Sequence, residues 1–280
     1  MATSFVKLQG TGNDFILFDL RFETEEQDWQ ALAPGLCDRY FGIGADGLLL
    51  VLPSTAPGAA FRMRVINSDG SEPEMCGNGL RCFVRYLHDQ GLVEGATVAV
   101  ETGAGVLRAE ILGDVGSDGT SAFQVRLDMG RPFVMGREML PMGDRRLDVH
   151  LVSMGNPHCV TFVDDLDRVP FAEVGPAVEG HPRFRQRTNA EFVQVLNRGR
   201  LRVKVWERGA GPTLACGTGA CAAVVAAISR SLTDRHVIVE LPGGALTIDW
   251  QVGGSVFLTG PAEPVFTGQI TLSALAPTGA

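Results

Sequence analysis

Cys76-Gly77-Asn78-Gly79 and Cys216-Gly217-Thr218-Gly219 are two versions of one short motif, and each stands at the start of a run typical of a helix. The two helices are expected over Gly79–Gln90 and Gly219–Arg230, each dense in alanine, leucine or valine on one side. The chain therefore places a cysteine and two glycines at the beginning of a helix twice. The rest of the sequence repeats around these two points.

The residues around the two motifs are spaced alike. Glu101 follows the first motif cysteine by 25 residues, and Glu240 follows the second by 24. Upstream, the pairs Gly12-Asn13 and Gly155-Asn156 precede the two cysteines by 63 and 60 residues, counted from the asparagines. Landmarks in one order at nearly equal spacing predict a duplicated α/β unit, with two domains related by a pseudo-two-fold axis.

Most other regular segments are predicted to be strands. Alternating or apolar runs occur at 15–18, 48–52, 61–66, 97–100 and 106–111, and again at 125–127, 147–152, 159–163, 201–206, 237–241, 245–250 and 256–258. The polar, glycine-rich stretch 113–119 is the best candidate for the boundary between the halves. The sequence thus predicts a strand-rich α/β chain with few helices.

Composition and charge exclude several classes of protein. The chain has 280 residues, of which 45% are hydrophobic and 20% charged, so it can bury a sizeable core. Its net charge of −8 gives no footprint for nucleic acid or an anionic membrane. The longest apolar run, 220–228, is too short to span a bilayer, and the first residues do not read as a leader peptide. We expect a soluble cytoplasmic protein that binds neither nucleic acid nor membrane.

Lysine and cysteine usage narrows the chemistry further. The two lysines, Lys7 and Lys204, are both expected on solvent-facing strand positions, so neither suits a Schiff base with pyridoxal phosphate. The six cysteines are expected to be reduced thiols, because they are few for the length of the chain. Their close pairs are not of the CxxC type, so zinc and thioredoxin-like sites are disfavoured. We expect neither cofactor nor metal.

A glycine-rich stretch, Gly42-Ile43-Gly44-Ala45-Asp46-Gly47, satisfies the GxGxxG pattern of dinucleotide-binding loops. That fingerprint needs a strand before it and a helix after it. Here the predicted strand 48–52 comes after the glycines. The stretch is therefore interpreted as a turn, and nucleotide binding is rejected.

Cys76 and Cys216 differ from the other four cysteines in their position between a polar loop and a helix start. There the helix dipole and free backbone N–H groups stabilise a thiolate, and the glycines let those groups approach a bound anion. The remaining cysteines are interpreted as small buried hydrophobes. They are Cys37, Cys82, Cys159 and Cys221.

The flanking segments supply polar candidates. Asn67-Ser68-Asp69-Gly70-Ser71-Glu72 precedes the first motif and can be no more than a tight turn. Glu207-Arg208 precedes the second; the pair is either a solvated strand end or a binding group, with the arginine for a carboxylate and the glutamate for an ammonium. His158 is a secondary candidate for a general base.

Two cysteines at equivalent helix starts suit one reaction better than others. A Cys–His nucleophile needs one cysteine, and a redox dithiol is normally close in sequence. Epimerisation next to a carboxylate needs a base on one face of the carbon and an acid on the other, and a thiolate and a thiol exchange these roles when the reaction reverses. The helix-start amides would bind the carboxylate and the charge that develops on it.

The motifs together resemble those of the diaminopimelate epimerase family, over essentially the whole chain. The matching stretches are Gly10–Phe15, Asn67–Glu72, Cys76–Cys82, Ser153–Cys159, Trp206–Gly211 and Ala215–Cys221. The resemblance implies a cofactor-independent isomerase that interconverts LL- and meso-diaminopimelate in lysine and peptidoglycan-precursor synthesis, and a homodimer. It also implies two α/β (α+β) domains, each a curled mixed or antiparallel sheet around a central helix. Their expected ranges are 1–121, with the C-terminal strand 264–280 returning to it, and 122–263.

Carried over position by position, the resemblance assigns the acid/base pair to Cys76 and Cys216. It assigns side-chain contacts with the substrate to Asn13, Asn67, Asn156, Asn189, Glu207 and Arg208, and backbone contacts to Gly77, Asn78, Gly217 and Thr218. Two positions depart from some members, which carry Gln in place of Gly47 and Ser in place of Thr218. His158 and Gly47 are accessory candidates, and no metal ligand is implied.

Two alternatives stay open. A related racemase or isomerase acting on another amino acid, such as proline, would keep the two-base geometry without needing the second set of polar groups. A binding protein that kept the pocket but lost catalysis is disfavoured because both Cys76 and Cys216 are present.

Overall fold

The computed structural model describes residues 2–23, 27–114, 123–251 and 253–272, and it has a mixed α/β fold, as expected. The chain divides into two compact units, Met1–Leu127 with Pro261–Ala280, and Asp128–Gly260. The boundary expected after residue 121 falls within 115–122, outside the described residues, so the domain ranges drawn from the sequence stay a prediction.

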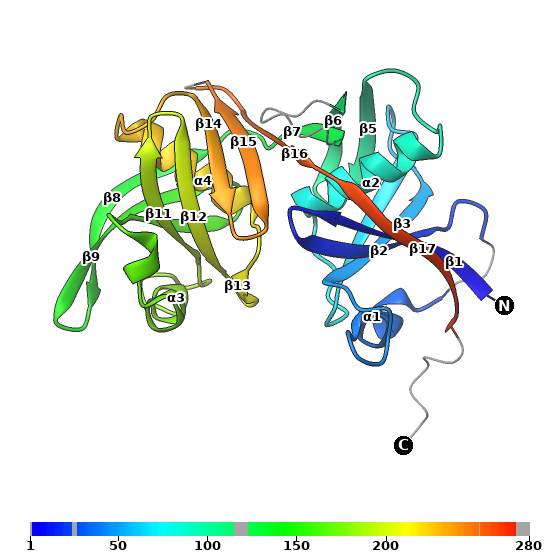
Figure 1. Ribbon diagram of the computed structural model, residues 1–280, viewed down its shortest axis with the longest axis horizontal. Coiled ribbons are helices and arrows are strands. Elements are labelled where there is room, and N and C mark those ends of the chain that lie inside the picture. Colours follow the sequence, from blue (N-terminus) through cyan, green and yellow to red (C-terminus); the bar gives the residue numbers. More distant parts are fainter. Residues whose placement is uncertain (1, 24–26, 115–122, 252, 273–280) are drawn as a thin grey trace. The chain divides into compact units, whose positions relative to one another are not determined.

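The first unit is one mixed sheet around a helix (Figure 1). Its strands lie in the order β17-β1-β2-β3-β4-β5-β6-β7, with β2–β3 and β4–β5 parallel and the other neighbours antiparallel. Helix α2 (Gly77–Asp89) lies inside this sheet, and α1 (Trp29–Cys37) lies outside it. The strands are β1 (Ala2–Gly10), β2 (Asn13–Asp19), β3 (Gly47–Pro53), β4 (Phe61–Asn67), β5 (Thr97–Thr102), β6 (Gly105–Asp114), β7 (Phe123–Asp128) and β17 (Glu263–Thr271).

The second unit repeats this plan. Its order is β8-β9-β10-β11-β12-β14-β15-β16, with β10–β11 and β12–β14 parallel, and the short β13 also pairs with β12. Helix α4 (Gly217–Ser229) lies inside, and α3 (Phe171–Glu179) outside. The other elements are β8 (Phe133–Met142), β9 (Arg145–Ser153), β10 (Pro157–Phe162), the 3-10 turn η1 (Leu166–Arg168), β11 (Asn189–Asn197), β12 (Arg200–Glu207), β13 (Gly211–Thr213), β14 (His236–Leu241), β15 (Gly244–Trp250) and β16 (Val256–Pro261).

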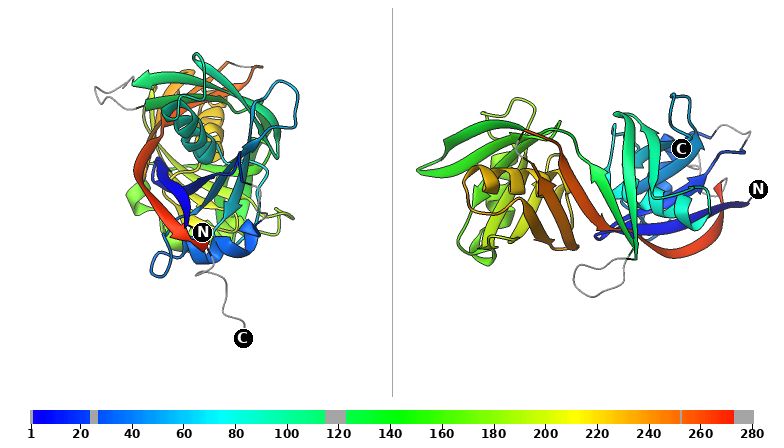
Figure 2. Two further views of the ribbon diagram at one scale, coloured as in Figure 1. Left: turned by 90° about the vertical axis from the view of Figure 1, so that its right-hand side faces the viewer. Right: turned by 90° about the horizontal axis from the view of Figure 1, so that it is seen from above.

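The pairing confirms the duplication at single residues. Arg62 of β4 pairs with Glu101 of β5, and Arg202 of β12 pairs with Glu240 of β14, so the two acidic landmarks occupy equivalent places. The last strand, β17, runs antiparallel to β1, and in the second unit β8 occupies the equivalent place beside β9. Both views of Figure 2 show the red ribbon of β17 next to the blue β1. The expected C-terminal strand therefore returns to the first unit, although 273–280 lie outside the described residues.

Both central helices are buried more completely than a one-sided apolar pattern predicts. Nine of the 13 residues of α2 and ten of the 13 residues of α4 are buried. A sheet that curls around a helix covers more than one helix face, so the usual polar stripe is reduced. In α4 the buried residues are mostly alanine and valine, which are small enough to let the strands close around it.

The outer helices α1 and α3 were not predicted. Each contains a proline, Pro34 and Pro176, next to a glycine. Both residue types disfavour helix interiors, so the sequence pattern argued against these helices. Packing decides instead: α1 contributes Trp29, Leu36 and neighbours to a cluster with β2 and β3. Among the described residues, none of the helices is long and apolar enough to cross a membrane.

Candidate active site

The two motif cysteines are the N-caps of the two central helices. Cys76 and Cys216 have extended backbone angles, and each sulfur accepts a hydrogen bond from the backbone N–H three residues on, that of Gly79 or Gly219, at 3.4 Å. A side-chain acceptor at this position satisfies one of the free N–H groups of the first turn. The same N–H and the helix dipole favour negative charge on sulfur, so both cysteines are placed for acid/base chemistry.

In the first unit, the structure brings Asn13, Cys76 and Asn78 together. The Cys76 thiol donates to Asn13 Oδ1 at 3.8 Å, and Asn78 Nδ2 donates to the same oxygen at 3.2 Å. Asn13 Nδ2 in turn donates to Asp46 Oδ2 at 2.7 Å, which fixes the direction of the Asn13 amide. Three of the predicted residues of this unit thus meet at the start of α2.

A tight turn places Asn13. Thr11 and Gly12 connect β1 and β2 as a two-residue loop, and both have positive φ angles, 58° and 81°. This combination is the one that matches the twist of a hairpin. The buried Arg81 guanidinium donates to Thr11 Oγ1 at 2.8 Å and to Asn78 Oδ1 at 3.0 Å, so α2 and the turn are held together beside the cysteine.

A buried lysine corrects one prediction. Lys7 was expected to face solvent, but it is 5% exposed, pairs with Asp14 at 2.6 Å and donates to the Gly44 carbonyl. Arg39 bridges Asp14 and Asp46 at 2.7 and 2.8 Å. Burial raises the pKa of Asp14, but hydrogen bonds from Arg39 and Lys7 outweigh burial and hold it at about 2. This network anchors the glycine-rich stretch interpreted as a turn, in which residues 42–46 form a bent, irregular loop and Gly47 begins β3.

Gly47 and Asn67 are partners in the β3–β4 ladder. A Cβ at Gly47 would lie 2.6 Å from the Ile66 carbonyl oxygen, so this chain has no room there for a side chain. Asn67 is exposed, and its Nδ2 donates to Ser71 Oγ at 2.9 Å within the turn that follows β4. Asn67 therefore stands exposed at the end of β4, and its side-chain hydrogen bond leads into that turn.

In the second unit, Cys216 is 5% exposed, whereas Cys76 is half-buried. Burial raises the pKa of the Cys216 thiol well above its ordinary value, and the carboxylates of Glu207 and Glu191 add to this. The Thr218 hydroxyl, 3.6 Å from the sulfur, and the Gly219 N–H act in the opposite direction.

Asn156 and His158 join this group. Asn156 Nδ2 donates to Thr218 Oγ1 at 3.2 Å, and His158 Nε2 lies 2.9 Å from Asn156 Oδ1. The other ring nitrogen, Nδ1, lies 2.6 Å from Glu191 Oε1, and both of these residues are fully buried. Burial raises the pKa of Glu191 although His158 acts to lower it. The His158 side chain is thus not open to solvent, and its Nε2 faces Asn156.

Asn189 links the start of β10 to the predicted residue Arg208. Its Nδ2 donates to the Pro157 carbonyl at 3.1 Å, and its Oδ1 accepts from the Arg208 backbone N–H at 2.8 Å. The Arg208 side chain is exposed and reaches the Gln186 carbonyl at 3.3 Å. Glu207 Oε1 accepts from the Thr213 hydroxyl. The acidic side chain of Glu207 and the basic side chain of Arg208 therefore lie at the end of β12, near Asn189 and outside the core.

The remaining cysteines are buried, as predicted for packing residues. Burial raises the pKa of Cys37 and of Cys82 to about 12, and that of Cys159 further. These thiols stay protonated at neutral pH. Among the described residues, no group of three or more His, Cys, Asp or Glu is arranged to hold a metal ion.

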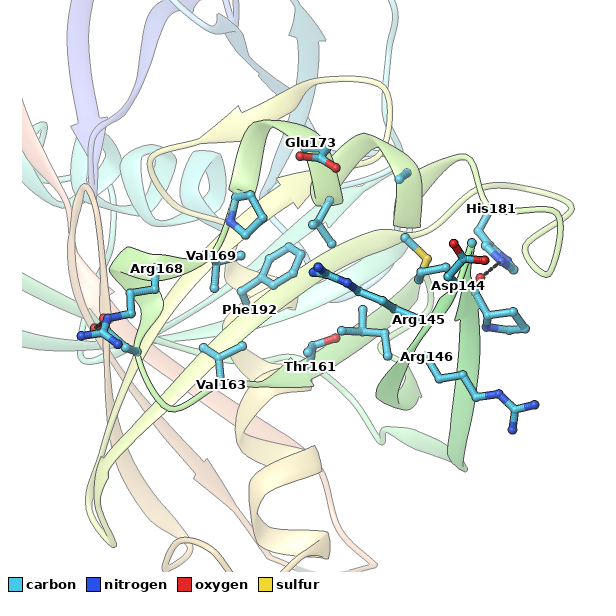
Figure 3. A pocket seen from close by; sticks show the side chains of 18 residues that line it. Asp144, Arg145, Arg146, Thr161, Val163, Arg168, Val169, Glu173, His181 and Phe192 are labelled. Atoms are coloured by element: carbon cyan, nitrogen blue, oxygen red, sulfur yellow. Dashed lines mark hydrogen bonds and ion pairs between the residues drawn. The ribbon is translucent and has the colours of Figure 1, made fainter.

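A cavity of about 1020 Å³ lies elsewhere in the second unit, between the β8–β9 hairpin and α3. Figure 3 shows the Arg145 side chain in it, pointing toward Phe192, and none of the predicted site residues lines it. A smaller cavity of about 420 Å³ is lined by Pro157 and His158 together with 183–188.

Comparison with known proteins agrees with the motifs. The sequence profile described as "Diaminopimelate epimerase" matches residues 5–134 and 150–265. The chain belongs to the diaminopimelate epimerase family. It is therefore an isomerase. Proteins with that name from Synechocystis sp. and Moorella thermoacetica are each 50% identical to it, over 96% of this chain and 99% of their own length.

Solved structures show the same fold at low sequence identity. A PhzF-family phenazine biosynthesis protein from Bacillus anthracis superposes with a TM-score of 0.74 at 18% identity, covering 97% of this chain and 99% of its own. A hydroxyproline epimerase from Agrobacterium vitis, with bound trans-4-hydroxy-L-proline, gives 0.73 at 17% identity, covering 96% and 92%. These likenesses establish the two-unit fold.

The sequence reasoning missed the residues that hold the predicted ones. Asp46 orients Asn13, and Glu191 contacts His158. Glu191 did leave a signal, because it is a charged residue between Ala190 and Phe192 in an otherwise apolar stretch. Asp46 left none that distinguishes it from an ordinary turn residue.

Proposed function

We propose that this chain interconverts LL- and meso-diaminopimelate, with Cys76 and Cys216 as the acid/base pair and no cofactor. The observation that carries the proposal is the equivalence of the two sulfurs: each caps a central helix and accepts one helix-start N–H at 3.4 Å. Family membership supports the substrate, because relatives that are 50% identical over nearly their full length carry that name.

In the proposed reaction, the thiolate of one cysteine removes the α-proton, and the thiol of the other delivers a proton to the opposite face of the carbon. The C–H bond breaks as an S–H bond forms, and the second S–H breaks as the new C–H forms. The negative charge that develops on the α-carboxylate is stabilised by helix-start N–H groups, those of Gly77-Asn78 and Gly217-Thr218. The reverse reaction exchanges the roles of the two sulfurs.

The distal end of the substrate is assigned to polar groups outside the helix starts. We propose that Arg208 binds the distal carboxylate and Glu207 the distal ammonium, with Asn67, Asn156 and Asn189 completing the contacts. An amino acid without the distal carboxylate would leave these groups unpaired, at roughly 1–3 kcal/mol each. Diaminopimelate is therefore favoured over lysine and over proline.

The experiment is an epimerisation assay on protein dialysed against EDTA and free of pyridoxal phosphate. We expect turnover of LL- and meso-diaminopimelate and, in kcat/KM, a preference of several orders of magnitude over lysine and proline. Comparable turnover of proline would refute this assignment and favour a proline racemase. No turnover of any of the three would favour the binding-protein alternative.

The remaining expectations belong to the same proposal. We propose that the protein takes part in lysine and peptidoglycan-precursor synthesis and acts in the cytoplasm. We propose a homodimer as its oligomeric state. Light scattering of the purified protein tests the dimer directly.

A further inference from the structure

We infer that Glu191 is a positioning residue for Cys216: it holds the His158 ring so that His158, Asn156 and Thr218 form one line of hydrogen bonds that ends at the Cys216 sulfur. The inference deepens the proposed function and rests on it for the kinetic part of its test. Nothing in the mechanism above uses Glu191, because this carboxylate is buried beneath the helix start and does not reach a substrate.

The line is continuous in the structure. Its contacts measure 2.6 Å from Glu191 Oε1 to His158 Nδ1, 2.9 Å from His158 Nε2 to Asn156 Oδ1, and 3.2 Å from Asn156 Nδ2 to Thr218 Oγ1. The last step is 3.6 Å, from Thr218 Oγ1 to Cys216 Sγ. Every contact lies within the second unit.

The chemistry of the partners fixes the direction of the line. Asn156 Oδ1 can only accept, so His158 Nε2 carries a hydrogen and donates it. Thr218 Oγ1 accepts from Asn156 Nδ2, which leaves its own hydrogen to point at Cys216 Sγ. The line therefore delivers a donor to the sulfur whenever Cys216 is a thiolate. The 2.6 Å contact between the second ring nitrogen and Glu191 Oε1 needs one hydrogen between the two atoms.

The first unit shows that the fold does not need this pair. Phe15 stands two residues after Asn13, as His158 does after Asn156, and Leu49 stands at the position of Glu191 in the neighbouring parallel strand. A Cβ at Gly79 would lie 3.0 Å from Leu49 and 3.6 Å from Phe15, and a Cβ at Gly219 would lie 3.0 Å from Glu191 Oε1.

The polar pair is also costly. Glu191 Oε2 is buried and has no hydrogen-bond partner among the described residues. Such an atom carries a desolvation penalty of roughly 1–3 kcal/mol that an apolar side chain avoids. The titratable groups around Glu191 are His158, Glu207, Cys216 and Cys159, and the carboxylate of Glu207 makes the charged form of Glu191 still less favourable. Because the first unit fills the equivalent positions with Phe and Leu, we attribute the polar pair of the second unit to a chemical rather than a packing role.

Three variants of the full chain separate position from charge. Glu191→Gln can donate its amide hydrogen to His158 Nδ1, which leaves the hydrogen on Nε2 and preserves the line. Glu191→Leu removes this partner and leaves Nδ1 only the longer, 3.5 Å contact with Asn189 Nδ2. The double variant His158→Phe/Glu191→Leu copies the first unit. All three variants lose the carboxylate, whose charge raises the pKa of the Cys216 thiol, so loss of that charge alone would move the Cys216 profile to lower pH. Loss of the hydrogen bonds moves the profile in the opposite direction, to higher pH.

The primary readout is the rate of alkylation by iodoacetamide at Cys76 and at Cys216, measured separately by peptide mass spectrometry between pH 6 and 10. This needs no substrate, so it stands even if the protein does not epimerise diaminopimelate. Thermal unfolding confirms that each variant is folded, and the double variant carries the test if Glu191→Leu does not fold. The second readout is kcat on diaminopimelate.

We expect Glu191→Leu and the double variant to move the Cys216 profile to higher pH, to leave Cys76 unchanged and to lower kcat about 10- to 100-fold, as loss of a residue that orients a functional histidine does. Glu191→Gln should stay within a few-fold of the original protein. An unchanged Cys216 profile in the folded variants would overturn the inference. So would a Glu191→Gln profile displaced as far as that of Glu191→Leu, because the loss of the carboxylate, which both variants share, would then be the cause.

Discussion

The two units share one plan and differ where each central helix begins. Beneath Cys76 the first unit packs Phe15 and Leu49, whereas beneath Cys216 the second unit buries His158 and Glu191. Both helices nevertheless begin with an N-capping cysteine, and in both the sulfur accepts a backbone N–H at 3.4 Å. Duplication thus preserved the scaffold, and the residues diverged at the site.

The difference teaches that equivalent cysteines are not identical acids. Cys216 is almost fully buried near two carboxylates, and its pKa is raised well above the ordinary value. Cys76 is half-buried and lies beside Asn13 and Asn78. In the proposed reaction both cysteines change protonation state, and for that the second unit would need extra donors that let Cys216 become charged.

The largest expected effect removes the feature that the units share. Cys76→Ala and Cys216→Ala should each lower kcat for diaminopimelate by about 1000-fold or more, because each loses one of the two proton-transfer groups. Cys82→Ala and Cys221→Ala are the matched controls inside the same helices and should retain most activity. Steady-state kinetics on the four variants decides; substantial activity of either of the first two contradicts a two-base reaction.

The next largest effect concerns the charged residues at the end of β12, which the equivalent strand β4 of the first unit lacks. Strand β4 ends at Asn67 and is followed by Ser68, whereas β12 ends at Glu207 and is followed by Arg208. Arg208→Met should lower kcat/KM for diaminopimelate about 100-fold or more, because a charge-assisted bond to the distal carboxylate is lost. Arg200→Met, at the first residue of β12 and paired with Glu240, is the control and should change little. Equal kinetics in the two variants would remove Arg208 from the substrate site.

A smaller effect concerns acid stability in the first unit. The pKa of Asp14 is held at about 2, so its contribution is present above pH 4 and is lost as pH falls toward 2. Asp14→Asn should lower the free energy of unfolding at pH 7 by on the order of 2 kcal/mol and flatten its decline between pH 4 and 2. Denaturant titrations at a series of pH values measure this.

The matched control is Asp148→Asn in the second unit, where the pKa is lowered by an exposed pair with Arg137. It should have a much smaller effect, because water screens that pair. An Asp14→Asn variant as stable as the parent at pH 7 would show that the buried network does not stabilise the β1–β2 turn.

The smallest effect tests the strand that precedes each site. Gly47 and Asn189 begin β3 and β11, and only the second position carries a side chain. Gly47→Ala should cost about 1–2 kcal/mol of stability, because its Cβ meets the Ile66 carbonyl at 2.6 Å. Asn189→Ala should act mainly on KM. A Gly47→Ala variant with unchanged thermal unfolding would show that the backbone there yields easily.

The architecture could be predicted from the sequence because the repeated motifs consist of residues with strong preferences for helix starts and turns. Cysteine and glycine at a helix start, and asparagine after a glycine turn, fix where α2, α4, β2 and β10 begin. The helices α1 and α3 escaped, since Pro34 and Pro176 oppose a helix locally and tertiary packing overrides them. Local propensity carries no information about which surface a helix will meet.

The predicted site residues could be placed in each unit, but their supports could not. Asn13 and Asn156 were identified by position, while Asp46, which orients Asn13, lies 33 residues away in sequence and reads as a turn residue. Lys7 was wrongly predicted to face solvent, because an alternating strand pattern does not reveal the partners that Lys7 meets in the interior. These are Asp14 and the Gly44 carbonyl. Contacts between residues distant in sequence are fixed by folding rather than by spacing.

The central claim is that two sulfurs act from opposite faces of one carbon, and isotope exchange tests it most directly. LL-diaminopimelate is incubated with the protein in deuterated water, and the α-deuterium of substrate and product is measured at early times by mass spectrometry. The account predicts deuterium in the meso product while the remaining LL substrate keeps its protium, because the acid that completes the reaction carries a solvent-derived hydrogen. Equal early deuteration of substrate and product, or a product that keeps its protium, would contradict the claim and indicate a single base.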